Sequence, residues 1–383
     1  MNPYLIWPLL STGVLGISAT PSRVILMFEI TMLPAREGDA LWIRWGDADN
    51  PRQMLVDSGI KASGRKLKSL ITAMPEERRH FDLIVITHID CDHIWGAISC
   101  FVESPKIPNL SISDFWFNGH KHLVESQHTL ESLGPIQGDE LSNWLEYSGH
   151  WNLAFDKKAV STSSDGQPIK IVLPGNMVVT VIGPTPKRLY ELAPSWPEAM
   201  SEALNEAPPP VVGLEELGAR SSIDISSLED LDEVANAQFV ADTSTTNASS
   251  ITLVLEYEGK RVLLAGDALA SDLIGAFEKF TDRLPISFDA VKVPHHGSEK
   301  NVSKELMASI SCDKWLISTD GNKHHHPDIA AVARIITCAN EPSIYFNVPS
   351  IHNDLWGRKR WQAEFKYQAF YGDQTKGLTV EVG

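Results

Sequence analysis

Residues 83–93, LIVITHIDCDH, decide the fold of this chain. The opening run LIVIT is almost continuously apolar, which predicts a strand buried on both faces. Four possible metal ligands follow within six residues, namely His88, Asp90, Asp92 and His93. Imidazole and carboxylate groups together suit divalent metals such as zinc or manganese. The sequence therefore predicts a metal site at the exit of a buried strand.

Three further predicted strands also end in polar side chains. Asp57 follows the apolar run 54–56, and Asp267 follows the run 262–266. A carboxylate at the end of a buried strand is costly unless it has a partner. The third strand, 291–293, leads into His295 and His296. We therefore expect these carboxylates and imidazoles to lie around the same site.

Two more candidate residues follow from their neighbours in the sequence. Lys292 stands just before the histidine pair, where a cation could contact a phosphate. The segment 323–328, KHHHPD, precedes a predicted helix. We interpret His324 and His325 as surface residues and keep His326 as a candidate.

Alternating strands and helices are predicted along most of the chain. Strands are expected at 28–33, 40–45, 53–57, 83–87, 111–117, 169–173, 178–182, 251–257, 261–265, 290–293 and 315–318. Helices are expected at 64–73, 94–101, 123–133, 139–147, 270–280, 303–309 and 328–337. Two halves that each mix strands and helices fit a pseudo-symmetric α/β sandwich.

The cluster at 88–93 resembles the HxHxDH signature of metallo-β-lactamase-fold hydrolases, in an HxDxDH variant. It is most similar to the hydrolase domain at the C-terminus of the competence DNA-uptake protein ComEC and to the free-standing bacterial relatives of that domain. Other matching segments, from Met27 to about Ile336, are the GQGDA-like turn 36–40, the first aspartate motif 55–59, the bridging aspartate Asp267, the KVPHHGS segment 292–298 and the late HxHP segment ending at 327.

This resemblance implies a four-layer αβ/βα sandwich that holds one or two divalent ions, zinc or manganese, at one edge between its sheets. One ion would be bound by His88, Asp90, Asp267 and a further group, and the other by Asp92, His93, Asp267 and either His296 or His295. Asp57 and Asn247 are expected to support these ligands. Asp90 replaces the usual histidine, which favours manganese. The usual histidine before the bridging aspartate is also missing, and Asn247 stands near its place, so a single-ion site remains an alternative.

The resemblance also implies a metal-dependent hydrolase that uses an activated water. Asp92 or Asp267 would position this water, and a second metal or His295 or His296 would stabilise charge on the attacked centre. His326 or Lys292 would contact a phosphate or protonate the leaving oxygen. The leading hypothesis is phosphodiester hydrolysis by a nuclease or nucleotide phosphodiesterase. One alternative is a lactone, thioester or β-lactam hydrolase. Another is a partner-controlled regulatory subunit that docks through an acidic insertion and through Trp356 and Trp361.

Composition limits the partners. The chain has 383 residues, of which 43% are hydrophobic, and a formal net charge of −16. This excludes wholesale disorder and argues against a broad basic surface. Contact with a nucleic acid or nucleotide should therefore be confined to a local groove, beside basic residues of the helix 64–73 or beside Lys300 and Lys304. The four cysteines have no paired spacing, which suits a reduced, cytoplasmic protein.

Two segments, at the start and in the middle of the chain, lack the alternating strands and helices predicted elsewhere. Residues 1–26 are predicted to be a tail or a mis-assigned start, with a signal peptide as the alternative, and 27–383 to form the hydrolase domain. The apolar run 4–19 is too short and too broken for a membrane helix, so no membrane association is predicted. Residues 193–246, rich in Pro, Ser and acids, predict a flexible insertion that could bind a protein partner.

Overall fold

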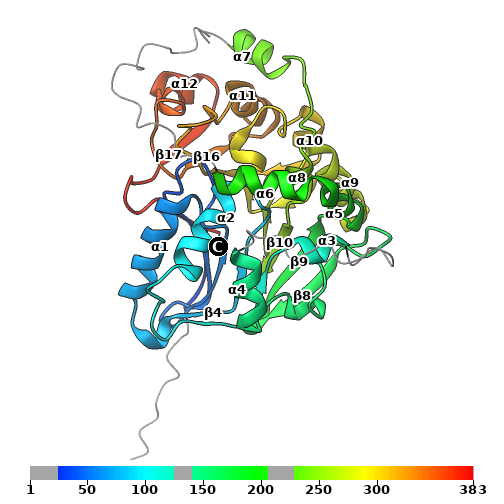
Figure 1. Ribbon diagram of the computed structural model, residues 1–383. Coiled ribbons are helices and arrows are strands. Elements are labelled where there is room, and N and C mark those ends of the chain that lie inside the picture. Colours follow the sequence, from blue (N-terminus) through cyan, green and yellow to red (C-terminus); the bar gives the residue numbers. More distant parts are fainter. Residues whose placement is uncertain (1–24, 125–139, 206–227, 383) are drawn as a thin grey trace, which may run out of the picture.

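Two β-sheets form the centre of the computed structural model, which describes residues 25–124, 140–205 and 228–382 (Figure 1). The first sheet has the order β18-β1-β2-β3-β5-β7, with strands Leu378–Glu381, Leu26–Met32, Leu41–Asp47, Arg52–Val56, Leu83–Val85 and Phe115–Trp116. The second has the order β17-β16-β15-β13-β11-β10-β9-β8, with strands Gln368–Tyr371, Ser343–Phe346, Lys314–Ile317, Ala290–Lys292, Lys260–Leu264, Thr252–Tyr257, Met177–Gly183 and Ile169–Leu173. Two short pairs are separate: β4 (His80–Phe81) with β6 (Ser111–Ile112), and β12 (Ile286–Phe288) with β14 (Ile310–Cys312).

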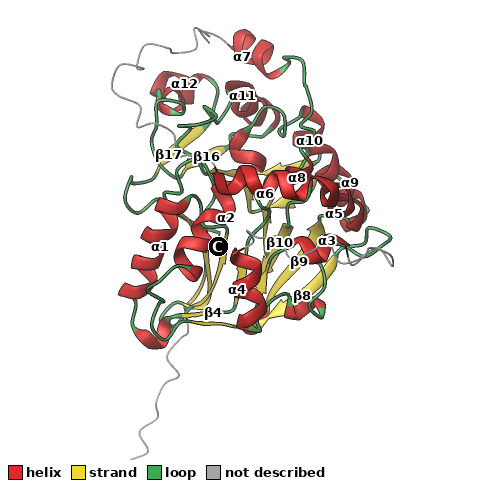
Figure 2. Ribbon diagram, viewed as in Figure 1, coloured by secondary structure: helices red, strands yellow, loops and turns green. Residues whose placement is uncertain are grey.

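Helices cover the outer faces of both sheets (Figure 2). The first sheet packs against α1 (Lys61–Ala73), α2 (Cys91–Ala97), the π-helical turn Ile98–Val102, α3 (His120–Val124), α4 (Glu140–Ser148), α5 (Pro186–Leu192) and α6 (Trp196–Asn205). The second packs against α7 (Leu228–Ala235), α9 (Ala270–Phe280), α10 (Lys304–Ala308) and α11 (Ile329–Cys338). Two further helices are α8 (Thr245–Ala248) and α12 (Lys359–Glu364).

The apolar strands are buried on both faces, as their sequences predict. In and after β5, Leu83 and Val85 point into the core between the two sheets, whereas Ile84 and Ile86 pack against the outer helices. In β10, Leu253 points inward and Val254 points toward the outer helices. Three apolar layers therefore separate four layers of secondary structure. This confirms the expected α/β fold class, with the four layers of an αβ/βα sandwich.

One edge of this sandwich gathers the ends of several parallel strands. β3 pairs in parallel with β5, and β11 pairs in parallel with β13, which in turn pairs in parallel with β15. Parallel strands that pair in register end at the same edge of their sheet. Two backbone hydrogen bonds join the sheets there, from the Ile251 nitrogen to the Thr87 oxygen (2.9 Å) and from the Asp320 nitrogen to the Arg36 oxygen (2.7 Å). The polar segments after these strands therefore meet between the two sheets.

The C-terminal segment supplies an edge strand to each sheet, and sequence analysis predicted neither strand. β17 lies at the edge of the second sheet, and β18 pairs with β1 at the edge of the first. The expectation that Trp356 and Trp361 form a docking surface is wrong, because both side chains are buried. They pack with Phe365 and Tyr367 against the outer face of the second sheet.

The described parts of the predicted insertion include two packed helices, α6 and α7. Trp196 of α6 and Leu231 of α7 are both fully buried. The buried Arg334 of α11 donates hydrogen bonds to the carbonyl oxygens of Ala235 and Ala237, which fixes the end of α7. The centre of the insertion, 206–227, lies outside the described residues, as do residues 1–24 and most of the predicted helix 123–133. Among the residues that are described, none of the helices has the length and apolar character to cross a membrane.

A buried histidine near β7 gives a pH prediction. The Gly119 nitrogen donates a hydrogen bond to Nδ1 of His122 (3.1 Å), which requires that nitrogen to be unprotonated. Burial, together with the nearby Lys121 cation, lowers the pKa of His122 to about 4. The unfolded chain binds this proton more readily, so stability falls as the pH drops through the range between the ordinary histidine pKa and about 4.

We expect this one group to cost about 2 kcal/mol of folding stability between about pH 7 and about pH 5. Urea unfolding at the two pH values would measure the loss. The His122→Gln variant should lose about 2 kcal/mol less than the unchanged protein over that interval. Equal losses in the two proteins would contradict this assignment.

Candidate metal centre

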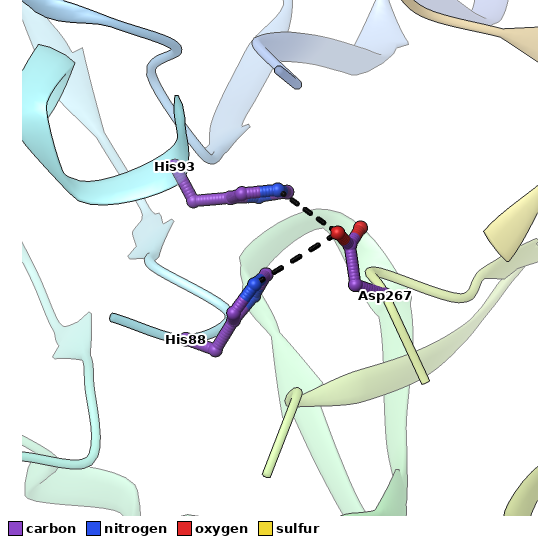
Figure 3. A group of neighbouring side chains, drawn as sticks. All are labelled: His88, His93 and Asp267. Atoms are coloured by element: carbon purple, nitrogen blue, oxygen red, sulfur yellow. Dashed lines mark ion pairs between the residues drawn. The ribbon is translucent and has the colours of Figure 1, made fainter. Parts of the chain in front are cut away.

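Asp267, which follows β11, lies at the middle of the polar cluster. Its Oδ2 atom is 3.4 Å from Nε2 of His93 and 3.9 Å from Nε2 of His88 (Figure 3). The same oxygen is 3.5 Å from Nε2 of His296 and 3.7 Å from Nε2 of His295. One carboxylate oxygen therefore faces four imidazoles from two separate regions of the chain.

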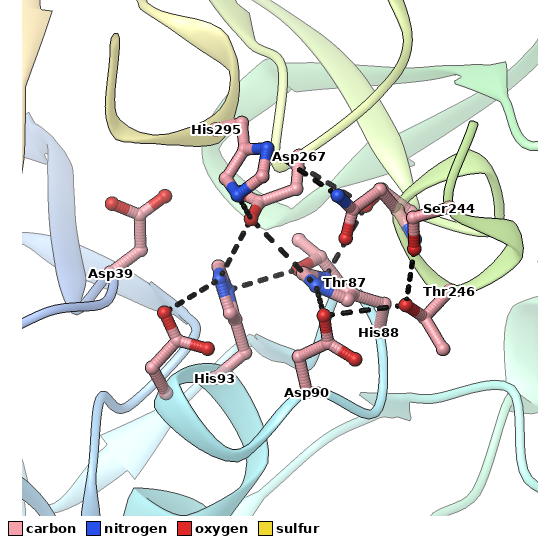
Figure 4. Close-up of polar contacts among 12 residues, drawn as sticks. Asp39, Thr87, His88, Asp90, His93, Ser244, Thr246, Asp267 and His295 are labelled. Carbon is pink, nitrogen blue, oxygen red and sulfur yellow. Dashed lines mark hydrogen bonds and ion pairs between the residues drawn. The ribbon is translucent and has the colours of Figure 1, made fainter. Parts of the chain in front are cut away.

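The first group of possible ligands is His88, Asp90 and Asp267. The Nδ1 atom of His88 lies 3.0 Å from Oγ1 of Thr87 and 3.3 Å from Oγ of Ser250. These contacts fix the ring with Nε2 toward the centre of the cluster, 3.5 Å from Oδ2 of Asp90. Thr246 donates a hydrogen bond to Oδ2 of Asp90 (Figure 4). The Asp90 side chain is 36% exposed, so this group opens toward solvent.

The second group is Asp92, His93 and His296, with Asp267 between the two groups. The Nε2 atoms of His93 and His296 are 3.3 Å apart. Oδ2 of Asp92 lies 3.4 Å from Nε2 of His296 and 3.9 Å from Nε2 of His93. One potential ligand atom from each of these three residues lies within 4.8 Å of the others, and the same holds for the trio of His88, His93 and Asp267.

The turn after β13 directs two neighbouring histidines to this point. Both His295 (φ 46°) and His296 (φ 53°) adopt the left-handed backbone conformation. That conformation is strained for residues other than glycine and is concentrated at functional sites. His296 is buried and belongs to the second group, whereas the His295 side chain is 23% exposed. The geometry therefore favours His296 over His295 as a ligand.

Asp57 contacts Thr87 and His93, so it can orient a candidate ligand without binding a metal itself. Its carboxylate accepts hydrogen bonds from the Thr87 nitrogen (2.8 Å) and from the Thr87 hydroxyl (2.8 Å). Its Oδ2 also lies 2.9 Å from Nδ1 of His93. This contact keeps a proton on Nδ1 and leaves Nε2 of His93 free to bind a metal.

Replacing Asp57 with asparagine is expected to weaken metal binding by about 10- to 100-fold. Asparagine cannot accept all three of these hydrogen bonds, so His93 would lose its fixed tautomer and orientation. Competition with a fluorescent chelator would give the dissociation constant of the variant. An unchanged constant in a folded variant would refute this role.

Asn247 contacts the cluster through His295. Its Nδ2 donates to Oδ2 of Asp242 (2.7 Å) and lies 3.4 Å from Nδ1 of His295. Oδ1 of Asn301 lies 2.9 Å from the same His295 nitrogen, and Nδ2 of Asn301 donates to Asp242 (3.0 Å). Sequence reasoning missed Asp242 and Asn301. Asp242 lies in the segment interpreted as a flexible insertion, and no motif contains Asn301.

Lys292 does not contact the open side of the site, contrary to expectation. Its side chain is fully buried, and Nζ forms an ion pair with Oδ2 of Asp39 (2.7 Å). A buried, paired ammonium cannot reach a substrate phosphate without breaking this pair. Oδ1 of Asp39 in turn lies 3.4 Å from Nδ1 of His296. Lys292 therefore orients Asp39 behind a candidate ligand.

The late histidine segment, 323–328, lies beside His295, which is 23% exposed. The His326 ring centroid is 5.4 Å from that of His295, and Nδ1 of His326 lies 3.3 Å from Oδ2 of Asp328. His324 stacks on His326 at 6.0 Å and is exposed. His326 can thus contact a molecule that reaches His295, whereas the interpretation of His324 as a surface residue agrees with its exposure.

The buried carboxylates of the cluster need a positive counter-charge. Asp39, Asp57 and Asp267 are almost completely buried, and Lys292 supplies only one permanent positive charge. Burial by itself would raise the pKa of Asp267, but the imidazoles of His296 and His93 hold it well below its usual range. Burial by itself would lower the pKa of His93, but the Asp267 and Asp57 carboxylates raise it well above its ordinary value.

These carboxylates therefore need either protonated imidazoles or a metal ion as their counter-charge. Nε2 of His88 and Oδ1 of Asp267 are buried and have no hydrogen-bond partner among the described residues. Unpaired buried atoms of this kind are expected where an ion supplies the missing partner. The nitrogen and oxygen donors fit a divalent metal such as zinc or manganese.

Comparisons with known proteins add little to this geometry. No protein-family model matches the sequence, and no curated protein matches it. Among solved structures, the metallo-β-lactamase-fold protein YhfI from Bacillus subtilis matches with a TM-score of 0.39 and 13% sequence identity. The match covers 93% of this chain and 100% of that chain.

Proposed function

We propose that this protein is a metal-dependent hydrolase that cleaves phosphodiester bonds in nucleic acids or nucleotides. The observation that carries the proposal is the position of Asp267 between two adjacent groups of ligands. Its Oδ2 lies near His88, which contacts Asp90, on one side, and near His93 and His296, which contact Asp92, on the other. A carboxylate in this position can bridge two ions, as in enzymes that use paired metals.

The side chains divide into those that would hold the ions and those that would face the substrate. When bound, divalent ions would supply Lewis acidity and lower the pKa of water toward neutrality. Asp90 and Asp92 are partly exposed, so each can accept a hydrogen bond from a water molecule at the mouth of the site. His295 and His326 lie side by side at this mouth and can donate hydrogen bonds to a phosphate or a proton to the leaving oxygen.

The phosphodiester assignment is supported by the donor set and by the order of the motifs along the chain, which resembles that of the ComEC hydrolase domain. Three of the six proposed ligands are carboxylates, which gives a harder site than three or more histidines would. Asp242 and Asp267 raise the pKa of His295, although burial alone would lower it. A protonated imidazole at the mouth would attract an anionic substrate despite the net charge of −16.

Purified protein should be assayed with manganese, magnesium or zinc on single- and double-stranded DNA, RNA, cyclic nucleotides and bis-p-nitrophenyl phosphate. Lactone and thioester substrates belong in the same panel. We expect turnover of at least one phosphodiester, and loss of that turnover in the His88→Ala and Asp92→Ala variants. Turnover of only the lactones or thioesters would reject the substrate class. If no substrate turns over while metal is measurably bound, the enzymatic proposal itself fails.

A further inference from the structure

Two histidines outside the metal centre, His325 and His352, face each other across two loops. His325 lies in the loop that follows β15, and His352 lies in the loop that follows β16. Nδ1 of His325 is 3.4 Å from Nε2 of His352, and the ring centroids are 4.8 Å apart. Neither residue belongs to the ligand groups around Asp267.

Local backbone geometry fixes both rings in place. His325 has a left-handed backbone (φ 62°), and its nitrogen donates to the Gly321 oxygen (2.9 Å), which closes a tight turn. The His352 ring packs directly on Gly321, where a Cβ atom would lie only 2.5 Å from Cδ2 of the imidazole. The turns therefore bring the two residues together, and the contact with Gly321 restrains the His352 ring.

The distance between the two nitrogens matches that between two ligands of one metal ion. Two imidazole nitrogens at normal zinc bond lengths, in tetrahedral geometry, are about 3.4 Å apart. The carboxylates of Asp320, which is also paired with Arg36, and of Asp354 act electrostatically on His352 and favour a positive charge there. Burial and the neighbouring His325 lower the pKa of His352, which favours the neutral form that binds metals.

We propose that His325 and His352 form a second transition-metal site, separate from the centre at Asp267. The site takes zinc, nickel or copper through two imidazoles, and water completes the coordination. It links the loop 319–328 to the loop 350–354. Because His326 is in the first of these loops, an ion at this site also restrains a side chain at the mouth of the metal centre.

Counting bound metal tests the proposal on the full-length protein. Nickel and zinc should be titrated against the unchanged protein and against His325→Asn and His352→Gln, with bound metal measured after gel filtration by elemental analysis. Asparagine tolerates the left-handed backbone, so the His325→Asn variant should keep its turn. The matched control is His324→Asn, which changes an exposed histidine in the same loop.

The unchanged protein and the control should bind one more ion per chain than either variant. The variants should keep the ions of the metal centre, and any phosphodiesterase activity measured at one or two equivalents of metal. Equal stoichiometry in all four proteins would overturn the proposal and leave the ring contact as a simple hydrogen bond. Because the count does not require activity, its outcome is independent of the proposed hydrolase function.

Discussion

Replacing Asp267 with asparagine is expected to abolish high-affinity metal binding and to reduce hydrolysis by more than about 100-fold. Even residues behind the ligands cost about 10- to 100-fold when they are removed, and Asp267 would contact the ions themselves. Its Oδ2 is the atom that all four imidazoles of the cluster approach. An amide cannot supply a negative oxygen that bridges two ions.

Elemental analysis after dialysis and an assay on the preferred phosphodiester would measure these effects. Asn has nearly the same shape as Asp, so circular dichroism should show that the variant folds. Asp282→Asn, at an exposed position away from the cluster, serves as the control and should match the unchanged protein. Full metal content in a folded Asp267→Asn variant would show that the bridging role is incorrect.

Replacing Lys292 with methionine is expected to lower the free energy of unfolding by about 3–5 kcal/mol. The substitution removes the permanent positive charge beside the buried carboxylate of Asp39, although methionine fills much of the same volume. Coulombic attraction to Lys292 lowers the pKa of Asp39, against the raising effect of burial. The variant should therefore also shift the pKa of Asp39 upward and weaken its contact with His296.

A double-mutant cycle with Asp39→Asn, Lys292→Met and both substitutions together separates this charge effect from packing. The Asp39→Asn/Lys292→Met variant should be more stable than Lys292→Met alone, because the orphaned charge is gone. Lys314→Met, which removes an exposed amine bonded to the Glu381 carbonyl, should change stability by no more than about 0.5 kcal/mol. A Lys292→Met protein as stable as this control would contradict the buried ion pair.

Much of the fold follows from the sequence because its signals are local. The strand 169–173 and the helix 270–280 match the structure residue for residue, since apolar periodicity and turn residues mark their ends clearly. β16, β17 and β18 were missed. β18 depends on a partner far away in the chain, because Glu381 and Thr379 pair with Glu29 and Thr31 of β1. β16 and β17 are four-residue strands that pair in parallel with the strands before them, β15 and β16, so they depend on the rest of the second sheet.

The candidate site was predictable where ligands follow buried strands. Asp57 and His88 stand at the ends of β3 and β5, and Asp267 follows β11, so parallel pairing brings each set to one edge of its own sheet. The packing of the two sheets against each other then brings the two sets together. Asp242 and Asn301 reach the site through loop geometry, which has no periodic signal. The prediction that Lys292 contacts a substrate phosphate was wrong, because sequence alone does not show that its neighbour in space is the buried Asp39.

Anomalous scattering from a crystal grown with manganese or zinc would test the central claim most directly. We predict a strong peak within bonding distance of Oδ2 of Asp267, about 2.0–2.2 Å, bounded by His88 and Asp90 or by Asp92, His93 and His296. Two such peaks would establish the bridged pair, and one would establish the single-ion alternative. A crystal of metal-saturated protein with no peak beside Asp267 would contradict the account.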